Sequence, residues 1–145
     1  MPTDGVYQII AYGAQGGDGF NFFGTVGGLG AERGGDFTLT AGQTLDIAVG
    51  GGGGDYSGIG SGGGSFVTWS GSALVIAGGG GGNGGANGTN GDGSNGDGSN
   101  GGGAGGGFSG GGSFLSDLAT NPIQVAGFQS GDGLVTIEDL PSQVP

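Results

Sequence analysis

The sequence contains no cysteine, no histidine and no lysine, and Arg33 is its only basic residue. Without cysteine the chain has no disulfide framework, no thiolate metal site and no thiol nucleophile. Histidine, the side chain that most often transfers protons near neutral pH, is also missing. These absences argue against catalysis, and we expect no enzymatic activity.

Positive charge is almost entirely lacking. Twelve acidic residues stand against one basic residue, which gives a formal net charge of -11 at pH 7. Proteins that bind nucleic acids neutralise phosphates with Lys and Arg, and anionic membranes attract the same side chains. We therefore expect neither nucleic acid nor a membrane surface as a partner.

Long hydrophobic runs are missing as well. No stretch approaches the ~18 consecutive apolar residues that predict a membrane-spanning helix. Residues 1–4 lack the basic and apolar regions of a secretory leader. Either the protein is intracellular, or the 145 residues are an excised segment of a longer protein. We favour the excised segment, with an extracellular or cell-surface location.

Glycine is what the chain has in excess, with 47 residues of this type and four prolines. Such a composition without a strict triplet repeat is typical of disorder. Ordering so many glycines would cost on the order of 50–90 kcal/mol in backbone entropy. A folded form therefore needs dense hydrogen bonding between its peptide groups.

Short runs with β character interrupt the glycine, and no segment shows sustained helical periodicity. Leu45, Ile47 and Val49 alternate with more polar residues, which predicts a half-buried strand. Together with Phe37 and Leu39 they predict a hairpin over residues 36–49, and Ser70, Gly71 and Ser72 predict a turn between two further strands. The expected strands cover residues 6–12, 37–40, 44–49, 65–69, 73–77, 123–126 and 134–138.

The glycine runs begin where predicted strands end. Ile47-Ala48-Val49 leads into Gly50, Gly51, Gly52, Gly53 and Gly54, and Val75-Ile76-Ala77 leads into Gly78, Gly79, Gly80, Gly81 and Gly82. The motif Gly-Gly-Gly-Ser-Phe occurs at residues 62–66 and again at residues 110–114. Oligoglycine adopts polyproline II helices that lack internal hydrogen bonds, so neighbouring helices would have to satisfy their peptide groups. We predict a single domain in which β-strands alternate with packed glycine helices, with residues 83–107 as a low-complexity loop or insert and residues 141–145 as a tail.

Four blocks of the sequence, residues 7–17, 39–49, 74–82 and 131–137, resemble the glycine-rich domain family. That family includes the ectodomain module of the anaplastic lymphoma kinase and leukocyte tyrosine kinase receptors and many bacterial surface proteins. The resemblance implies a small antiparallel, jelly-roll-like β scaffold that carries a bundle of glycine polyproline II helices, with almost no α-helix. It does not imply a kinase, since the chain contains no phosphate-binding or catalytic motif.

The aromatic residues are the candidate contacts for a partner. Phe20, Phe22 and Phe23 form the densest aromatic cluster, and we single them out with Tyr56 as a partner-binding patch, with burial in the scaffold as the alternative. Trp69 lies two residues after Val67 on a predicted strand. We expect Trp69 in the core, with a platform for stacking a sugar as the alternative.

The acidic residues offer a weaker candidate site. Asp92, Asn95, Asp97 and Asn100 carry the oxygen ligands that calcium prefers, although their spacing fits neither the EF-hand loop nor the Gly-Gly-x-Gly-x-Asp nonapeptide. No other cofactor is expected. Arg33 is expected to pair with a neighbouring acid such as Glu32 or Asp36.

These observations favour an extracellular structural or adhesive module that assembles with itself into surface fibres or matrix. The alternative is a module that binds a protein or glycan through its aromatic patch. A lesser alternative is ice binding by the glycine helices.

Overall fold

Eight β-strands and no helix make up the part of the chain that the structure describes. The structure is a computed structural model that describes residues 1–17, 27–53, 60, 62–82 and 111–141. The expectation of a mostly β chain is confirmed. The strands are β1 (Gly5–Tyr12), β2 (Gly30–Leu39), β3 (Leu45–Ala48), β4 (Ser65–Trp69), β5 (Ser72–Ala77), β6 (Phe114–Leu115), β7 (Thr120–Gln129) and β8 (Leu134–Leu140).

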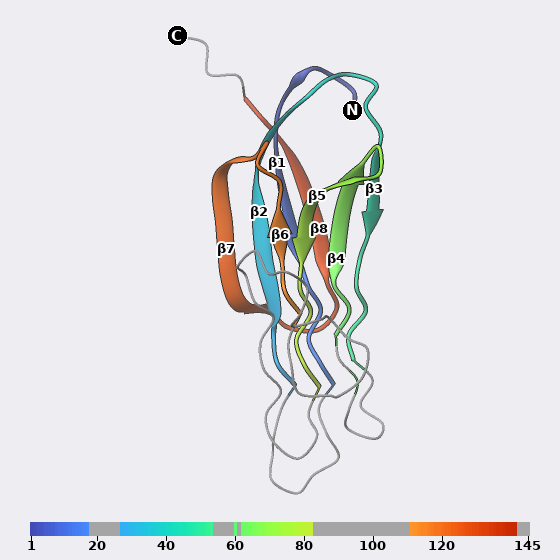
Figure 1. The fold of residues 1–145 in the computed structure, drawn as a ribbon, viewed down its shortest axis with the longest axis vertical. Coiled ribbons are helices and arrows are strands. Elements are labelled where there is room, and N and C mark those ends of the chain that lie inside the picture. The colour runs from blue at the N-terminus through green and yellow to red at the C-terminus, as the bar shows by residue number, and fades with distance from the viewer. Residues whose placement is uncertain (18–26, 54–59, 61, 83–110, 142–145) are drawn as a thin grey trace, which may run out of the picture.

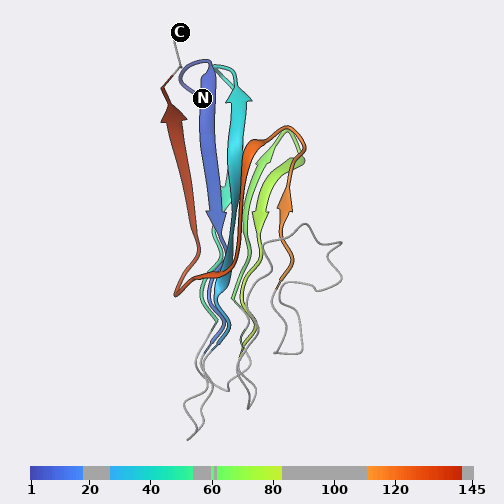
Figure 2. The same cartoon turned by 90° about the vertical axis from the view of Figure 1, so that its left-hand side faces the viewer.

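The strands form two antiparallel sheets that pack face to face. In the first sheet the order is β7-β2-β1-β8, so that β1 and β2 pair in the middle and β7 and β8 flank them. In the second sheet β3, β4, β5 and β6 follow one another as a meander. Figure 1 shows the strands running along the long axis, and Figure 2 shows the two layers from the side.

Alternating side chains from both sheets build the core. On β1 the buried residues are Tyr7, Ile9 and Ala11, two positions apart, as a strand with one buried face requires. They pack with apolar side chains of β2, β4, β5 and β6, which are Phe37, Leu39, Val67, Leu74, Val75, Ala77 and Leu115.

The predicted turn between β4 and β5 is confirmed. Ser70 and Gly71 both have positive φ angles, of 50° and 79°, and they connect Trp69, the last residue of β4, to its cross-strand partner Ser72, the first residue of β5. Two central residues of this kind suit a tight hairpin, because their twist matches that of the flanking strands.

The predicted hairpin over residues 36–49 is wrong. β2 already lies between β1 and β7, so it has no free edge for β3, and residues 40–44 carry the chain across to the second sheet. The strand predicted at residues 44–49 is present as β3, an edge strand of that sheet. Leu45 packs against the core, whereas Ile47 and Val49 are 49% and 53% exposed.

Trp69 is the other correction. Val67 is fully buried on β4, yet Trp69, two residues further, is 38% exposed. Burial along β4 falls toward the end of the strand, where Thr68 is partly exposed, Trp69 is exposed and the β4–β5 turn begins.

Candidate functional site

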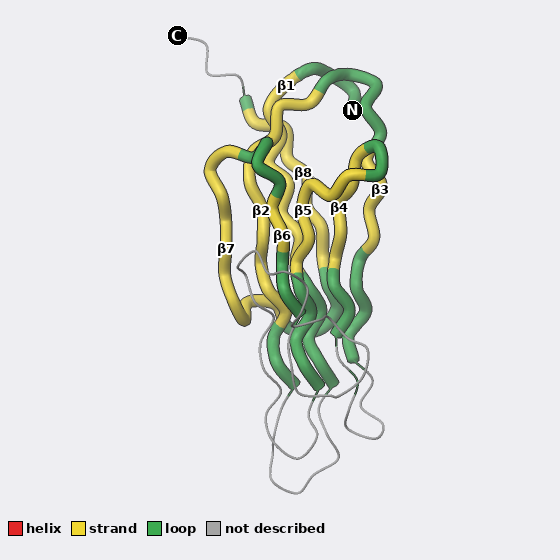
Figure 3. The backbone as a smooth tube through the Cα atoms, viewed as in Figure 1, coloured by secondary structure: helices red, strands yellow, loops and turns green. Residues whose placement is uncertain are grey.

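Six glycine-rich segments lie side by side at one end of the β-sandwich, and each continues one strand. Figure 3 shows them as loops that extend from the strands β1 to β6. Three segments leave the frame and three return to it. Hydrogen bonds join segments of opposite direction, such as 13–17 and 27–30, and also segments of the same direction, such as 13–17 and 78–82. We call this set the glycine bundle, and it comprises residues 13–17, 27–30, 50–53, 60 with 62–64, 78–82 and 111–112.

The segment of residues 13–17 donates hydrogen bonds in directions that repeat every three residues. The amides of Gly13 and Gly16 donate to the carbonyls of Ala31 and Gly28, each at 2.9 Å. The amides of Ala14 and Gly17, one residue further along, donate instead to Gly63 and Gly60, at 2.9 and 2.7 Å. The segment therefore bonds one neighbour with every third residue and a second neighbour with the next.

The same interval recurs elsewhere in the bundle. The amides of Gly28 and Ala31 donate to the carbonyls of Gly81 and Gly78, at 2.8 and 2.9 Å. Segment 78–82 is also linked to residues 62–64 by Gly62 N to Gly80 O, at 2.8 Å. The bundle is thus cross-linked in several directions by peptide groups, unlike a sheet, where each strand has neighbours on two sides.

Missing side chains make this spacing feasible. A Cβ atom added at Gly13 or Gly16 would lie 2.0 or 2.1 Å from the carbonyl oxygen of Gly78 or Gly81. Added at Gly27 or Gly30 it would lie 1.9 or 1.7 Å from the carbonyl oxygen of Gly16 or Gly13. Such distances are far below contact, so the backbones could not approach one another with any other residue at these positions.

Not every position in the bundle is closed in this way. In segment 50–53, a Cβ added at Gly50 or Gly53 would meet a carbonyl oxygen at 2.2 or 2.0 Å. At Gly51, between them, no atom of the described residues lies within 4 Å. The closed positions are again three residues apart, which matches the interval of the hydrogen bonds.

Two buried serines tie the bundle to the frame. The amide of Gly50 donates to Ser65 Oγ at 3.1 Å, and Ser65 Oγ donates to the carbonyl of Tyr12 at 2.7 Å. The amide of Gly78 donates in the same manner to Ser113 Oγ at 2.9 Å. Ser65 and Ser113 occupy the same place in the two Gly-Gly-Gly-Ser-Phe motifs, and Gly50 and Gly78 each begin a glycine run. The two kinds of sequence repeat therefore belong to one structural device.

The turn between β7 and β8 closes one side of the bundle. Gln15 N donates to Gly131 O at 2.8 Å, and Gly131 N donates to Gln15 Oε1 at 3.0 Å. Asp132 Oδ1 accepts a hydrogen bond from Gly52 N at 2.8 Å, and Gly133 N donates to Gly50 O at 2.8 Å. The carboxylate of Asp132 thus satisfies a peptide group of the bundle.

The structure describes only part of the predicted sites. Residues 50–53 and 78–82 of the two glycine runs belong to the bundle. Gly54, the aromatic residues Phe20, Phe22, Phe23 and Tyr56, and the calcium candidates Asp92, Asn95, Asp97 and Asn100 lie outside the described residues. The predictions for these side chains stay predictions.

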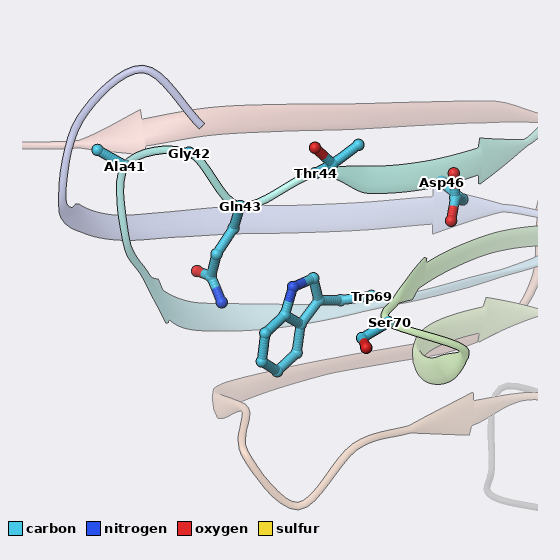
Figure 4. Close-up of a pocket in the computed structure, with 7 residues that line it drawn as sticks. All are labelled: Ala41, Gly42, Gln43, Thr44, Asp46, Trp69 and Ser70. Atoms are coloured by element: carbon cyan, nitrogen blue, oxygen red, sulfur yellow. The ribbon is translucent and has the colours of Figure 1, made fainter.

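An open hollow of about 560 Å³ lies at the opposite end of the frame, around Trp69. Its lining combines the indole with polar side chains of Gln43, Thr44, Asp46 and Ser70. In Figure 4 the Gln43 amide points from the loop toward the indole of Trp69, and Ser70 lies on the other side of the ring. The sequence prediction missed this hollow because it placed Trp69 in the core. The turn residues directly after Trp69 were the signal that it lies at the end of the strand.

A second hollow crosses the outer face of the first sheet and contains Asp36, which is buried. Asp36 Oδ2 accepts a hydrogen bond from Asn121 Nδ2 at 2.8 Å. Across the described ranges, no group of three or more His, Cys, Asp or Glu side chains is arranged to hold a metal ion.

Arg33 is buried on β2, and burial lowers the pKa of its guanidinium. Its Nη1 donates to the carbonyl of Ile123 on β7 at 3.1 Å. Its expected pairing with Glu32 or Asp36 stays a prediction.

The part of the chain that the structure describes has no helix of the length and apolarity needed to cross a membrane. A comparison with protein-family models and with curated proteins finds no match to this chain.

Proposed function

We propose that this chain is an extracellular structural and adhesive module without enzymatic activity, built to hold a rigid bundle of glycine helices. The observation that carries the proposal is the network of hydrogen bonds between glycine segments. Such a network requires glycine at defined positions and offers no side chains for chemistry there. A chain that uses its glycines in this way is suited to form a stiff body rather than to turn over a substrate.

We infer that the segments of the bundle are polyproline II helices. A polyproline II helix has three residues per turn and no internal hydrogen bonds. Residues 13–17 change bonding partner with that period, and their backbone amides donate to other parts of the chain. The frame shares with a jelly roll its two four-stranded antiparallel sheets, while β3 to β6 follow a simpler meander.

The resemblance of residues 7–17, 39–49, 74–82 and 131–137 to the glycine-rich domain family supports a place at the cell surface. The formal charge of -11 agrees with that location, because a chain that nucleic acids repel does not have the charge of an intracellular nucleic-acid-binding protein.

Self-association through strand edges is the proposed route to fibres or matrix. β8 is an edge strand of the first sheet and β3 of the second. Along β8, Leu134 is 46% exposed, and the strand contains no proline before its end. Unpaired backbone groups on such an edge can pair with another copy of the chain.

Sedimentation velocity at increasing protein concentration, followed by electron microscopy, tests this assembly. The expected result is concentration-dependent association and filaments. Thr136→Lys places a charge on the exposed edge of β8 and should abolish them, whereas Thr136→Ser, the matched control, should preserve them. A chain that stays monomeric at high concentration and forms no filaments would refute assembly.

Binding of a protein or glycan through the aromatic cluster is the second candidate. The density of aromatic residues at positions 20–23 of the sequence supports it. Binding that persists unchanged in Phe22→Ala and Phe23→Ala variants would remove this candidate.

A further inference from the structure

We propose that two copies of this chain dock face to face through the outer surface of the second sheet, centred on Phe66, Ile76 and Phe114. We call these three residues the Phe-Ile-Phe row. The proposal rests on the self-association proposed above and adds a second contact to it. Because the row shares no residue with the β8 edge, the two contacts can be tested separately.

The register of the second sheet builds the row. Phe66 on β4 pairs with Ile76 on β5, and Ile76 pairs with Phe114 on β6, so the three side chains are cross-strand neighbours on one face. Successive side chains of a strand point to opposite faces, so this face is the one turned away from the core. The core residues directly beside them along the three strands are Val67, Val75 and Leu115. Phe66 and Phe114 are 40% and 37% exposed, and Ile76 is partly exposed.

The two Gly-Gly-Gly-Ser-Phe motifs place both aromatic rings. In each motif the serine is buried and holds the first amide of a glycine run, so the phenylalanine that follows it takes the outer face. A Cβ added at Gly64 would lie 3.2 Å from Cζ of Phe66, which shows that this ring lies over the bare backbone of the preceding glycine. The repeat therefore produces an anchor inside the chain and an exposed apolar row outside it.

The distribution of charge favours a second copy of the chain on this face. Among the described strands β3 to β6 only Asp46 is charged, and it lies on the β3 edge, outside the row. On the outer face of the first sheet, by contrast, Gln8 lies between Asp36 and Glu138. Like charges that face each other across an interface are unfavourable. Two copies that each carry a net charge of -11 therefore meet less repulsion at the row than at the first sheet.

The order of the side chains suits a two-fold symmetric contact. The row reads Phe-Ile-Phe from either end, so a two-fold axis over Ile76 brings this residue against its own counterpart and each ring against a ring of the other copy. Such a contact uses the same patch on both copies. Paired aromatic rings stabilise it beyond the apolar area that they bury.

A fibre requires this second contact. Antiparallel pairing of β8 with β8 of another copy is itself two-fold symmetric, so it closes at the dimer. Two different two-fold contacts on one chain link copies into an open fibre. The row crosses only three strands, which lie about 4.8 Å apart, and is small beside the roughly 1,200–2,000 Å² of a stable interface. We therefore expect a weak contact that strengthens an assembly in which β8 edges also pair.

Cross-linking through a single cysteine tests the contact directly, because the chain has no cysteine of its own. In Ile76→Cys the two new thiols face each other across the axis, so mild oxidation should link copies into a disulfide dimer. Thr38→Cys, at an exposed position on β2, is the control. We expect the dimer of Ile76→Cys to form at least about tenfold faster, since a disulfide forms only between closely apposed residues. Equal rates for the two variants would overturn the proposal.

A charge placed in the row locates the contact. In the Ile76→Cys chain, Phe66→Glu puts like charges on both copies and should slow the cross-link about tenfold or more. Phe128→Glu makes the same change at an exposed ring of β7, outside the row, and should leave the rate unchanged. Both positions are exposed, so both variants should keep the fold, which circular dichroism checks. A rate that Phe66→Glu lowers no more than Phe128→Glu would refute the row as the contact.

Electron microscopy of the same samples separates this contact from the β8 edge. A cross-link at residue 76 without filaments in the unmodified chain would contradict edge pairing and support the row. Filaments of the unmodified chain without that cross-link would refute the row and support edge pairing.

Discussion

At the scale of single residues, the position of a missing Cβ decides what each glycine of the bundle contributes. Glycine has a high entropic cost on folding, so a chain that keeps it at a given position gains only if a side chain there would prevent packing. Gly50 and Gly51 are neighbours in one segment, yet only the first faces a carbonyl oxygen at close range. Comparing the two positions therefore shows where glycine is required by packing and where it is only part of a glycine-rich composition.

Replacing these two glycines by alanine should therefore change the free energy of unfolding by very different amounts. Gly50→Ala forces its Cβ toward Gly63 O, which would lie 2.2 Å away, and we expect a loss of about 3 kcal/mol or more of unfolding free energy. Gly51→Ala meets open space and should change it by less than about 0.5 kcal/mol. Urea unfolding of both variants measures the difference, and equal losses would show that Gly50 is not packed as described.

Tyr12, at the end of β1, links stability to alkaline pH. Burial raises its pKa above the ordinary value of 10.0, and the charge and hydrogen bond of Glu32, its cross-strand neighbour, raise it further. Between the unfolded and the folded pKa, the unfolded chain releases this proton while the folded chain retains it. The stability contribution is therefore complete below about pH 10 and is lost as the pH rises through the folded pKa.

We expect the urea midpoint to fall as the pH rises above about 10. Tyr12→Phe removes the titrating group and should make this fall shallower. An identical pH profile for Tyr12→Phe and the unmodified chain would contradict the link.

At the scale of elements, each strand from β1 to β6 works together with the glycine segment that continues it. Each segment is joined to its own strand through the chain, and two of the glycine runs are also joined to a second strand by hydrogen bonds. Ser65 and Ser113 accept these bonds from the first amides of the two runs, at Gly50 and Gly78. These hydrogen bonds fix the position of the glycine segments relative to the strands, and the two serines are the residues that make them.

Ser65→Ala should loosen this junction. The substitution leaves the amide of Gly50 and the carbonyl of Tyr12 without their partner in a fully buried place, so we expect a loss of about 1–3 kcal/mol. Ser72→Ala, at an exposed position on β5, is the matched control and should stay within about 0.5 kcal/mol. Thermal unfolding compares them, and a Ser65→Ala variant as stable as the control would exclude a role for the serine in holding the bundle.

Local sequence patterns predicted most strands, because alternation and turn residues are local properties. The strand predicted at residues 6–12 corresponds to β1, and the strand predicted at residues 65–69 corresponds to β4. The part of β2 before Phe37 contains Gly, Glu, Arg and Asp without alternation, and it forms a strand because β1 and β7 pair with it on both sides. Only such long-range pairing distinguishes it from a loop.

The remaining errors have the same origin. A turn at residues 40–43 suits a hairpin or a crossing between sheets equally well, and the choice depends on which edges are free. Trp69 is exposed because it is the last residue of β4, directly before the turn, and the burial of Val67 two residues earlier does not extend that far. The Gly-Gly-Gly-Ser-Phe repeat, by contrast, marked both serine junctions in advance, although their role was visible only once Gly50 and Gly78 were placed beside them.

At the scale of the whole molecule, a β-sandwich and a glycine bundle lie end to end along the long axis (Figures 1 and 2). Ordering the glycines has a large entropic cost, and hydrogen bonds between peptide groups are the compensation that the bundle provides. Because Ser65, Ser113 and the β7–β8 turn bond both parts, the sandwich and the bundle should unfold as one cooperative unit.

Amide hydrogen exchange, followed by NMR, tests this account most directly. The amides of Gly16, Gly28, Gly62, Gly63 and Gly80 donate to other glycine-bundle residues. They should exchange as slowly as the core amides of β1 and lose protection at the same urea concentration. Exchange of these glycines at the rate of an unfolded peptide, while β1 stays protected, would show that their peptide groups bond to water and would contradict the bundle.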